Sequence, residues 1–288
     1  MNRSYFQGLK VVAQQKALGL FLDIFTDAAI AFSLTTLRTG VTNVIRVVRS
    51  SDNDERDFSA IEIIDGTLVS WVGVGNDGLV KVIYDQSLNG NHARQTDTAR
   101  MARIVVNGNL QMINGRPAID FNSGNWYATD NPYPTGTAGT HLYTATAGSS
   151  NQRILDTRGT GGKGAVKGWQ HKTLNAGDVS LFDQGQGSGT FLETSSIIRS
   201  GQFIASINFE EGFVEEFTND GATPSDTDTA PDAIDFNSGN PLYIGANVNG
   251  QTTQLYTGEL QEVILFNTDR SAQRVDMLQN RNEYFNIF

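Results

Sequence analysis

The chain lacks cysteine altogether, is poor in proline, and has fewer basic than acidic residues. Without cysteine it can form no disulfide, no thiolate zinc site and no cysteine nucleophile. With six prolines among 288 residues, it is neither collagen-like nor a proline-rich linker. The formal net charge of −10 gives a surface that repels a phosphate backbone, so we expect no nucleic-acid partner.

Long hydrophobic runs are also missing. No stretch approaches the roughly 18 apolar residues that a membrane helix needs. The nearest candidate, residues 17–22, is short, ends at Asp23 and is followed by no small-residue cleavage site. We therefore expect no export signal and no membrane partner.

The sequence does contain a series of short strand-like runs from about residue 28 onward. Each run is rich in β-branched or aromatic residues, and clusters of Gly, Asn, Asp or Ser separate one run from the next. No helical pattern of about 10–15 residues alternates with them, which argues against a parallel α/β sheet. The pattern predicts one all-β sandwich or barrel over residues 26–288. The clearest runs are residues 44–48, 79–84, 201–207, 242–245 and 260–266.

Residues 1–25 differ from the rest and are interpreted as an N-terminal arm. Apolar residues recur there at nearly helical spacing, which predicts one amphipathic helix over residues 1–22. Such a helix either packs on its own domain or docks onto a neighbouring subunit, and the sequence leaves both open. The residues on its stripe are Phe6, Leu9, Val12, Ala13, Lys16, Ala17 and Leu20.

A second helix is predicted at the C-terminus. Ser271 can cap it, and Val275, Leu278 and Phe285 then fall roughly on one side.

One eight-residue segment occurs twice. Residues 118–125 and residues 233–240 both read AIDFNSGN, and each copy precedes an aromatic or apolar strand start. A single duplication is no solenoid, which needs several copies at a regular period. We interpret the repeat as similar strand-to-turn geometry at two places.

Metal and cofactor sites are not indicated. The three histidines, His92, His141 and His171, are too widely spaced for a zinc site. Residues 52–57 are rich in oxygen ligands but lack the glycine and distal glutamate of a calcium loop. With Arg46 and Arg49 just before them, a salt-bridged turn is the favoured interpretation. We therefore expect neither a metal nor a cofactor.

Three aromatic residues near predicted loops are candidates for ligand binding: Trp126, Tyr127 and Trp169. Aromatic rings in such places can stack on sugars, and the alternative is that they pack in the core or at its rim.

A more specific signal is a series of segments in a fixed order. Residues 29–40 lead to residues 45–53, then to residues 82–93, which contain YDQSLNGNHA, and then to residues 114–121. This series resembles the catalytic-domain family of fungal α-L-arabinofuranosidase B, and also the related concanavalin-A-like domains of bacteriophage structural proteins. The resemblance is good over residues 28–128 and continues weakly to residues 258–265. It implies a concanavalin-A-like (jelly-roll) antiparallel β-sandwich.

The polar residues of these segments are interpreted as structural first and ligand-binding second. Asn and Gly tolerate the left-handed backbone of a tight turn, and an aspartate at such a turn can accept bonds from loop amides. These residues are Arg49, Asp52, Asp85, Asn89, Asn91 and His92.

The catalytic residues of the arabinofuranosidases do not carry over. That family has adjacent cysteines in its active-site region, and this chain has none. Residues 178–184 offer no match for the family's nucleophilic glutamate. The family's acid/base aspartate follows an I-G-G-like turn, and at the comparable turn this chain has Asn247. An asparagine cannot donate a proton as a carboxylic acid does.

The resemblance therefore implies a non-enzymatic bacteriophage virion protein on the capsid or tail surface. It would be made in the host cytoplasm, reside in the virion, contact other virion proteins through residues 1–25 and be oligomeric in the particle. The alternative is a glycan-binding module for attachment to a cell surface, and an arabinofuranosidase-type glycoside hydrolase comes third.

Overall fold

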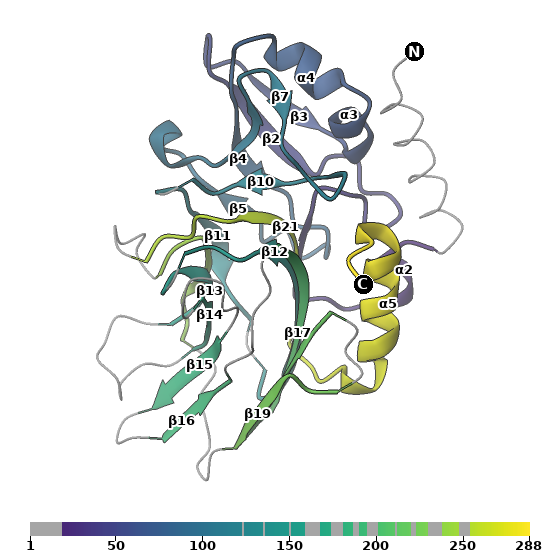
Figure 1. Ribbon diagram of the computed structural model, residues 1–288, viewed down its shortest axis with the longest axis vertical. Helices are drawn as coiled ribbons and strands as arrows, with labels where there is room; N and C mark the ends of the chain where they lie inside the picture. The colour runs from purple at the N-terminus through teal and green to yellow at the C-terminus, as the bar shows by residue number, and fades with distance from the viewer. Residues whose placement is uncertain are drawn as a thin grey trace.

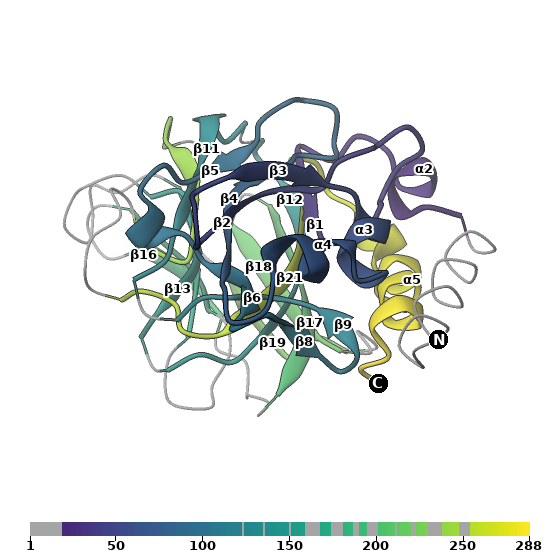
Figure 2. The same cartoon turned by 90° about the horizontal axis from the view of Figure 1, so that it is seen from above.

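The computed structural model describes most of the chain from residue 19 onward. The described residues are 19–122, 124–134, 136–149, 151–158, 168–173, 181–186, 190–194, 201–210, 212–219, 223–229, 238–247 and 254–288, with the backbone alone described for 181–186 and 190–193. Within them, 19 strands form one hydrogen-bonded network whose pairings are antiparallel. The network folds into two layers, which we call sheet I and sheet II (Figures 1 and 2).

Sheet I can be followed strand by strand through its register. Its order is β3 (Glu55–Phe58), β2 (Ile45–Arg49), β4 (Gly78–Ile83), β5 (Ala93–Arg94), β11 (Tyr127–Pro132), β20 (Pro241–Ile244), β13 (Arg153–Asp156), β14 (Gln170–Lys172), β15 (Leu181–Gln186) and β16 (Thr190–Glu193).

Sheet II is built around the long strand β21 (Glu259–Phe266), with β12 along one edge and β1 and β10 along the other. Pairing of β4 with β6 joins the two sheets at one corner. The remaining strands of sheet II, with the separate hairpin β8–β9, are β1 (Ile30–Ser33), β6 (Arg103–Val106), β7 (Asn109–Leu110), β10 (Ile119–Asp120), β12 (Gly139–Thr146), β17 (Gln202–Glu210), β18 (Phe213–Thr218), β19 (Asp226–Thr229), β8 (Met112–Ile113) and β9 (Arg116–Pro117).

The alternation of side chains along each strand creates two hydrophobic clusters. Tyr143 of β12 and Val263 of β21 point between the sheets and join the main core. Their neighbours Leu142 and Ile264 point the other way and join a second cluster. Sheet II is therefore buried on both faces, which explains why all eight residues of β12 are buried.

Helix α5 (Arg274–Phe285) and the short α2 (Phe21–Ile24) cover the outer face of sheet II (Figure 1). A buried ion pair fixes α5 to this face: Arg281 Nε lies 2.7 Å from Glu262 Oε1 of β21. Both side chains are only 2% exposed.

Two further helices, α3 (Ala60–Ile64) and α4 (Thr67–Val72), follow β3. A capping box starts α3, because the Ser59 side chain accepts the Glu62 N–H while the Glu62 carboxylate accepts the Ser59 N–H. Short 3₁₀ turns occur at η1 (Thr98–Arg100) and η3 (Ser271–Gln273). No helix in the described part of the chain is long and apolar enough to cross a membrane.

The structure confirms the predicted all-β antiparallel sandwich and the C-terminal helix. The helix starts at Arg274, after the 3₁₀ turn at Ser271, and Val275 is exposed whereas Leu278 and Phe285 are buried. Most of the predicted N-terminal helix, residues 1–18, lies outside the described residues. The division at residue 25 stays a prediction, and Phe25 itself packs in the second cluster.

Candidate functional site

The outer face of sheet I carries a row of mainly polar residues. Register pairs Arg94 with Ala128, Ala128 with Tyr243, Tyr243 with Asp156, and Asp156 with Gln170. Directly paired residues present their side chains on the same face of a sheet. The adjacent row, which includes Tyr127, Ile244, Leu155 and His171, belongs to the buried interior. The Arg94 row therefore faces away from the main core.

An aromatic pair stands on this outer face. Trp126, just before β11, and Tyr243 of β20 are both half-buried, and their ring centroids lie 6.1 Å apart at an interplanar angle of 38°. The next residue in each case, Tyr127 or Ile244, is fully buried. Because side chains alternate along a strand, these buried neighbours hold the pair outward. Two partly exposed rings at this spacing can stack on a flat apolar surface of a ligand.

A glycine positions the end of β20 beside this pair. Gly245 has a φ of +83°, and a Cβ atom there would lie 2.6 Å from the ring of Phe121 and 2.9 Å from the carbonyl oxygen of Asn125. The turn therefore requires glycine. Asn247, which follows it, is half-buried.

A buried carboxylate lies next to the aromatic pair. Asp156, the register partner of Tyr243, is 1% exposed, and its Oδ1 accepts the Arg158 N–H at 2.7 Å. Arg158 Nε lies 3.4 Å from the same oxygen, and Arg153 Nε lies 3.9 Å from Oδ2. Burial raises the pKa of Asp156, and the positive charge of Arg158 opposes this. Asp156 and Arg153 are buried, so the polar group exposed on this side is Arg158, whose side chain is 22% exposed.

An exposed ion pair lies on the other side of the aromatic rings. Arg94 Nε is 2.7 Å from Asp130 Oδ1 and 2.9 Å from Oδ2. The small side chain of Ala128 stands between Arg94 and Tyr243 in the row. Hydrogen-bonding groups therefore flank an aromatic surface on both sides.

Of the three aromatic residues proposed from the sequence, Trp126 is the accessible one. Tyr127 is fully buried, and its hydroxyl donates to the Val80 carbonyl at 2.7 Å and accepts the Ala102 N–H at 2.9 Å. Trp169 is also fully buried, with its ring centroid 4.2 Å from that of His141. The hypothesis that Tyr127 and Trp169 contact a ligand does not fit this burial, because each points into the core.

Asp85 ties the end of β4 to β1. Its carboxylate accepts the backbone N–H groups of Ala31, Ser87 and Asn91 at 3.0, 3.0 and 3.1 Å, and the Ser87 hydroxyl at 2.7 Å. The side chain is 8% exposed. All of these partners belong to the chain itself, so the carboxylate acts as the centre of a structural corner.

The rest of this segment extends the same corner. Asn89 Nδ2 donates to two carbonyl groups just before β1, at 3.0 and 3.1 Å. Asn91 exchanges two hydrogen bonds with the backbone of Asn131, at 2.7 and 3.2 Å. His92 Nδ1 accepts the Asp85 N–H at 3.0 Å. The segment thereby connects β1, β4 and β11.

Arg49 and Asp52 form a salt-bridged turn after β2. Arg49 Nε and Nη2 lie 2.9 and 2.7 Å from the two Asp52 oxygens, and Nη1 donates to the Trp71 carbonyl at 2.7 Å. The hydrogen bond from Arg49 lowers the pKa of Asp52. No group of three or more His, Asp or Glu side chains suited to a metal occurs in the described part of the chain.

Sequence reasoning missed Tyr243 and Asp156 as members of the site. Pairing of β11 with β20 brings Tyr243 beside Trp126, and pairing of β13 with β20 brings Asp156 beside Tyr243. In both cases the paired strands lie far apart in the sequence. One signal was available: the two AIDFNSGN copies precede β11 and β20, which are neighbouring strands. The second copy lies largely outside the described residues.

Comparison with known proteins rests on structure alone, since no protein-family model and no curated protein sequence matches the chain. An arabinofuranosidase complexed with arabinofuranosyl-α-1,2-xylobiose is similar over 94% of this chain and 64% of its own, with 14% identity and a TM-score of 0.61. A GH54 α-L-arabinofuranosidase soaked with a cyclic sulfate inhibitor covers the same shares, with 13% identity and a TM-score of 0.57. The chain thus spans less than two thirds of the length of these proteins and shares their β-sandwich fold.

Proposed function

We propose that this chain is a carbohydrate-binding β-sandwich protein that holds a glycan on the outer face of sheet I without cleaving it. The observation that carries the proposal is the half-buried pair of Trp126 and Tyr243, presented outward by neighbouring strands. Binding pockets combine such aromatic surfaces with a few polar groups that fix orientation.

The chemistry of a sugar ring matches the arrangement. The C–H face of a pyranose or furanose ring stacks on an aromatic ring, while its hydroxyl groups need donors and acceptors at the rim. The partly exposed Arg158, held by the buried Asp156, stands on one side of the pair, and Arg94 and Asp130 stand on the other. The fold adds support, because the similar arabinofuranosidase is described in complex with an arabinosyl xylobiose.

A glycan array followed by calorimetry tests the proposal. The panel should include arabinose-containing, xylose-containing and sialylated oligosaccharides. We expect a hit whose affinity falls roughly 5–30-fold in Trp126→Ala, because loss of one aromatic stacking surface costs about 1–2 kcal/mol. Phe288→Ala is the matched control, since Phe288 is an aromatic residue, 44% exposed, at the C-terminus. Equal affinity in wild type and Trp126→Ala would contradict the proposed site.

Hydrolysis is the second candidate, and one observation favours it. Backbone register pairs Gln170 with Asp183 of β15, and Asp183 with Glu193 of β16. A glycosidase needs two carboxyl groups about 5–9.5 Å apart, and two of these directly paired positions carry acidic residues in the sequence. Incubation with the best array ligand and with 4-nitrophenyl arabinofuranoside decides between the two. We expect no product, whereas release of sugar that is lost in Glu193→Gln would establish a hydrolase.

We further propose, from the resemblance in sequence, that the glycan-binding face serves a virion surface protein. Attachment to a particle and binding to a cell-surface glycan are compatible, because the candidate glycan site occupies only the outer face of sheet I. Incubating labelled protein with phage particles that lack it tests this role. Co-sedimentation is the expected result, and protein that neither joins particles nor self-assembles would refute it.

A further inference from the structure

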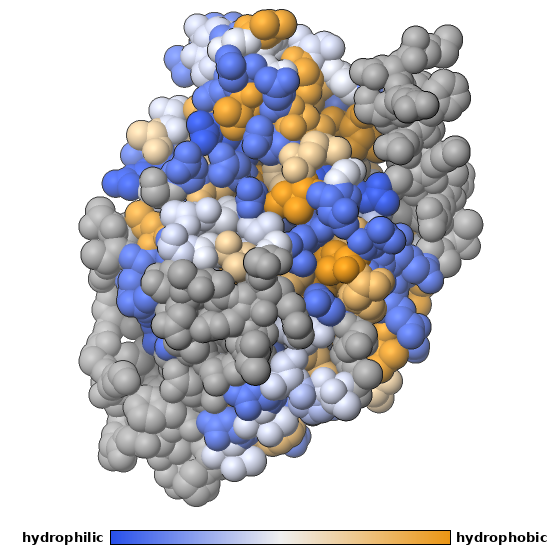
Figure 3. All heavy atoms as spheres, in the orientation of Figure 1, coloured by the Kyte–Doolittle hydropathy of each residue, from blue (hydrophilic) through white to orange (hydrophobic). Residues whose placement is uncertain are grey.

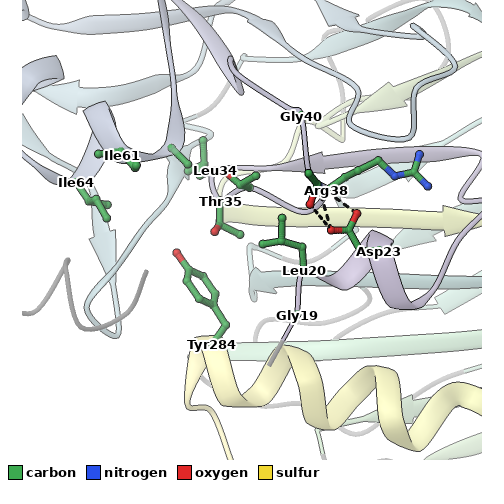
Figure 4. A pocket seen from close by; sticks show the side chains of 13 residues that line it. Gly19, Leu20, Asp23, Leu34, Thr35, Arg38, Gly40, Ile61, Ile64 and Tyr284 are labelled. Carbon is green, nitrogen blue, oxygen red and sulfur yellow. Dashed lines mark hydrogen bonds between the residues drawn. The ribbon is translucent and has the colours of Figure 1, made fainter. Parts of the chain in front are cut away.

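A groove separates helix α3 from the C-terminal end of α5, on the other side of the molecule from the candidate glycan site. It encloses a cavity of about 400 Å³. In Figure 4 the side chains of Ile61 and Ile64 from α3, Leu34, Leu20 and Tyr284 surround this space. Ile61 is 53% exposed. The walls are therefore mainly apolar and include a large exposed side chain.

The surface around the groove is hydrophobic over a wider area. Figure 3 shows hydrophobic side chains at the surface over α3 and beside α5. Large exposed apolar surfaces of this kind mark sites of interaction. The groove also has a polar end, where the Asp23 carboxylate accepts the Thr39 N–H at 3.1 Å.

The position at which the described chain begins points to the occupant. Gly19 and Leu20 line the groove, so the 18 residues before them leave from its rim. Gly19 has a φ of +82°, the left-handed conformation that commonly follows the last residue of a helix. A helix formed by the residues before Gly19 would therefore end at the groove.

The sequence of residues 1–18 suits this groove. Phe6, Leu9, Ala13 and Ala17 share one face at helical spacing. Charge is also complementary: residues 1–18 contain three basic residues and no acidic one, whereas the rest of the chain has 18 basic and 31 acidic residues. Asp65 and Glu283, which are adjacent in sequence to the lining residues Ile64 and Tyr284, are exposed acidic residues.

We propose that residues 1–18 form an amphipathic helix that folds back into the groove of the same chain. The occupant is the chain's own segment because no linker separates it from the groove. Direct attachment gives a local concentration in the millimolar range or above, which a second copy does not reach in dilute solution.

Introduced cysteines test this contact directly, because the full-length chain has none of its own. We expect Leu9→Cys combined with Ile61→Cys to form a disulfide within one chain on mild oxidation. The control combines Leu9→Cys with Thr227→Cys, an exposed position in β19 at the opposite end of the molecule from α3 (Figure 1), and it should keep its thiols. Disulfides formed between chains, or no disulfide in the Leu9–Ile61 pair, would overturn the proposal.

A second measurement needs no disulfide. In a full-length chain carrying Ile61→Cys alone, the helix should slow labelling of the thiol by a maleimide. Adding Phe6→Asp and Leu9→Asp should speed that labelling roughly tenfold or more, because two buried apolar contacts are lost. Since Ile61 is exposed and residues 6 and 9 precede the packed body, the variants should fold. An unchanged labelling rate would show that the segment does not occupy the groove.

Discussion

Lowering the pH from about 7.5 to about 5 should destabilise this protein through two buried histidines. His141 and His171 are fully buried between the sheets, with His141 Nδ1 3.1 Å from His171 Nε2. The rings of Trp169 and Tyr143 pack against them. Burial lowers the pKa of His171 to about 3, and burial together with the charge of His171 lowers the pKa of His141 well below its usual value.

The size of the effect follows from proton linkage. In the unfolded chain each histidine has a pKa of about 6.5, so at pH 5 it is nearly fully protonated. The folded protein keeps His171 neutral at that pH, and the difference is about 2 kcal/mol in the free energy of unfolding. Burial of His141 lowers its pKa as well, so its protonation in the unfolded chain adds to this loss in the same direction. Because the folded pKa values are depressed, the stability is full above about pH 6.5 and is lost as the pH falls below it.

Urea denaturation at a series of pH values measures this loss. Most carboxyl groups titrate near pH 4, so the interval above pH 5 mainly reports the histidines. The double variant His141→Leu/His171→Phe should lose most of the pH dependence whatever its absolute stability, whereas His92→Gln, at a half-buried histidine, should retain most of it. The reasoning fails if wild-type stability changes by less than about 1 kcal/mol over this interval, or if the double variant keeps the full dependence.

Three further stability predictions concern particular contacts. Asp85→Ala should lower the free energy of unfolding by about 3–5 kcal/mol, because three backbone N–H groups lose their acceptor. The control Asp130→Ala, which removes an exposed ion pair, should lower it by about 1 kcal/mol or less. Equal losses in the two variants would contradict the structural role of Asp85. Arg281→Met should lower the free energy of unfolding by about 3–5 kcal/mol, because it leaves the buried carboxylate of Glu262 without its partner. Adding Glu262→Leu should restore most of that free energy. A double variant that is as unstable in urea denaturation as Arg281→Met would count against this explanation. Leu88→Gly should stabilise the protein by about 0.5–1 kcal/mol, because Leu88 adopts a φ of +77°, which glycine tolerates better than leucine, and its side chain is 72% exposed. A lower melting temperature for the variant would contradict this prediction.

Strands were predictable because their residues carry the pattern locally. The run at residues 260–266 corresponds to β21, Glu259–Phe266, and the run at residues 79–84 corresponds to β4, Gly78–Ile83. Helices α3 and α4 were not predicted, although Ser59 and Glu62 have the spacing of a capping box. Both helices are only five or six residues long, which is too short for a helical period to show.

The candidate site was less predictable because register decides it. Trp126 and Tyr127 are adjacent in sequence, yet one lies at the surface and the other in the core. A shift of one residue in the pairing of β11 with β20 would exchange them, and nothing local fixes that pairing. The neighbours Tyr243 and Asp156 come from strands that meet only in the folded sheet. The sequence therefore pointed to one member of the site and could not assemble the rest.

The most direct test of the central claim is a structure of the protein with the best oligosaccharide from the array. The account predicts a sugar ring stacked on Trp126 and Tyr243, with its hydroxyl groups within hydrogen-bond distance of Arg158 or Arg94. A sugar bound on another face, or no binding to any glycan on the panel at millimolar concentration, would contradict it.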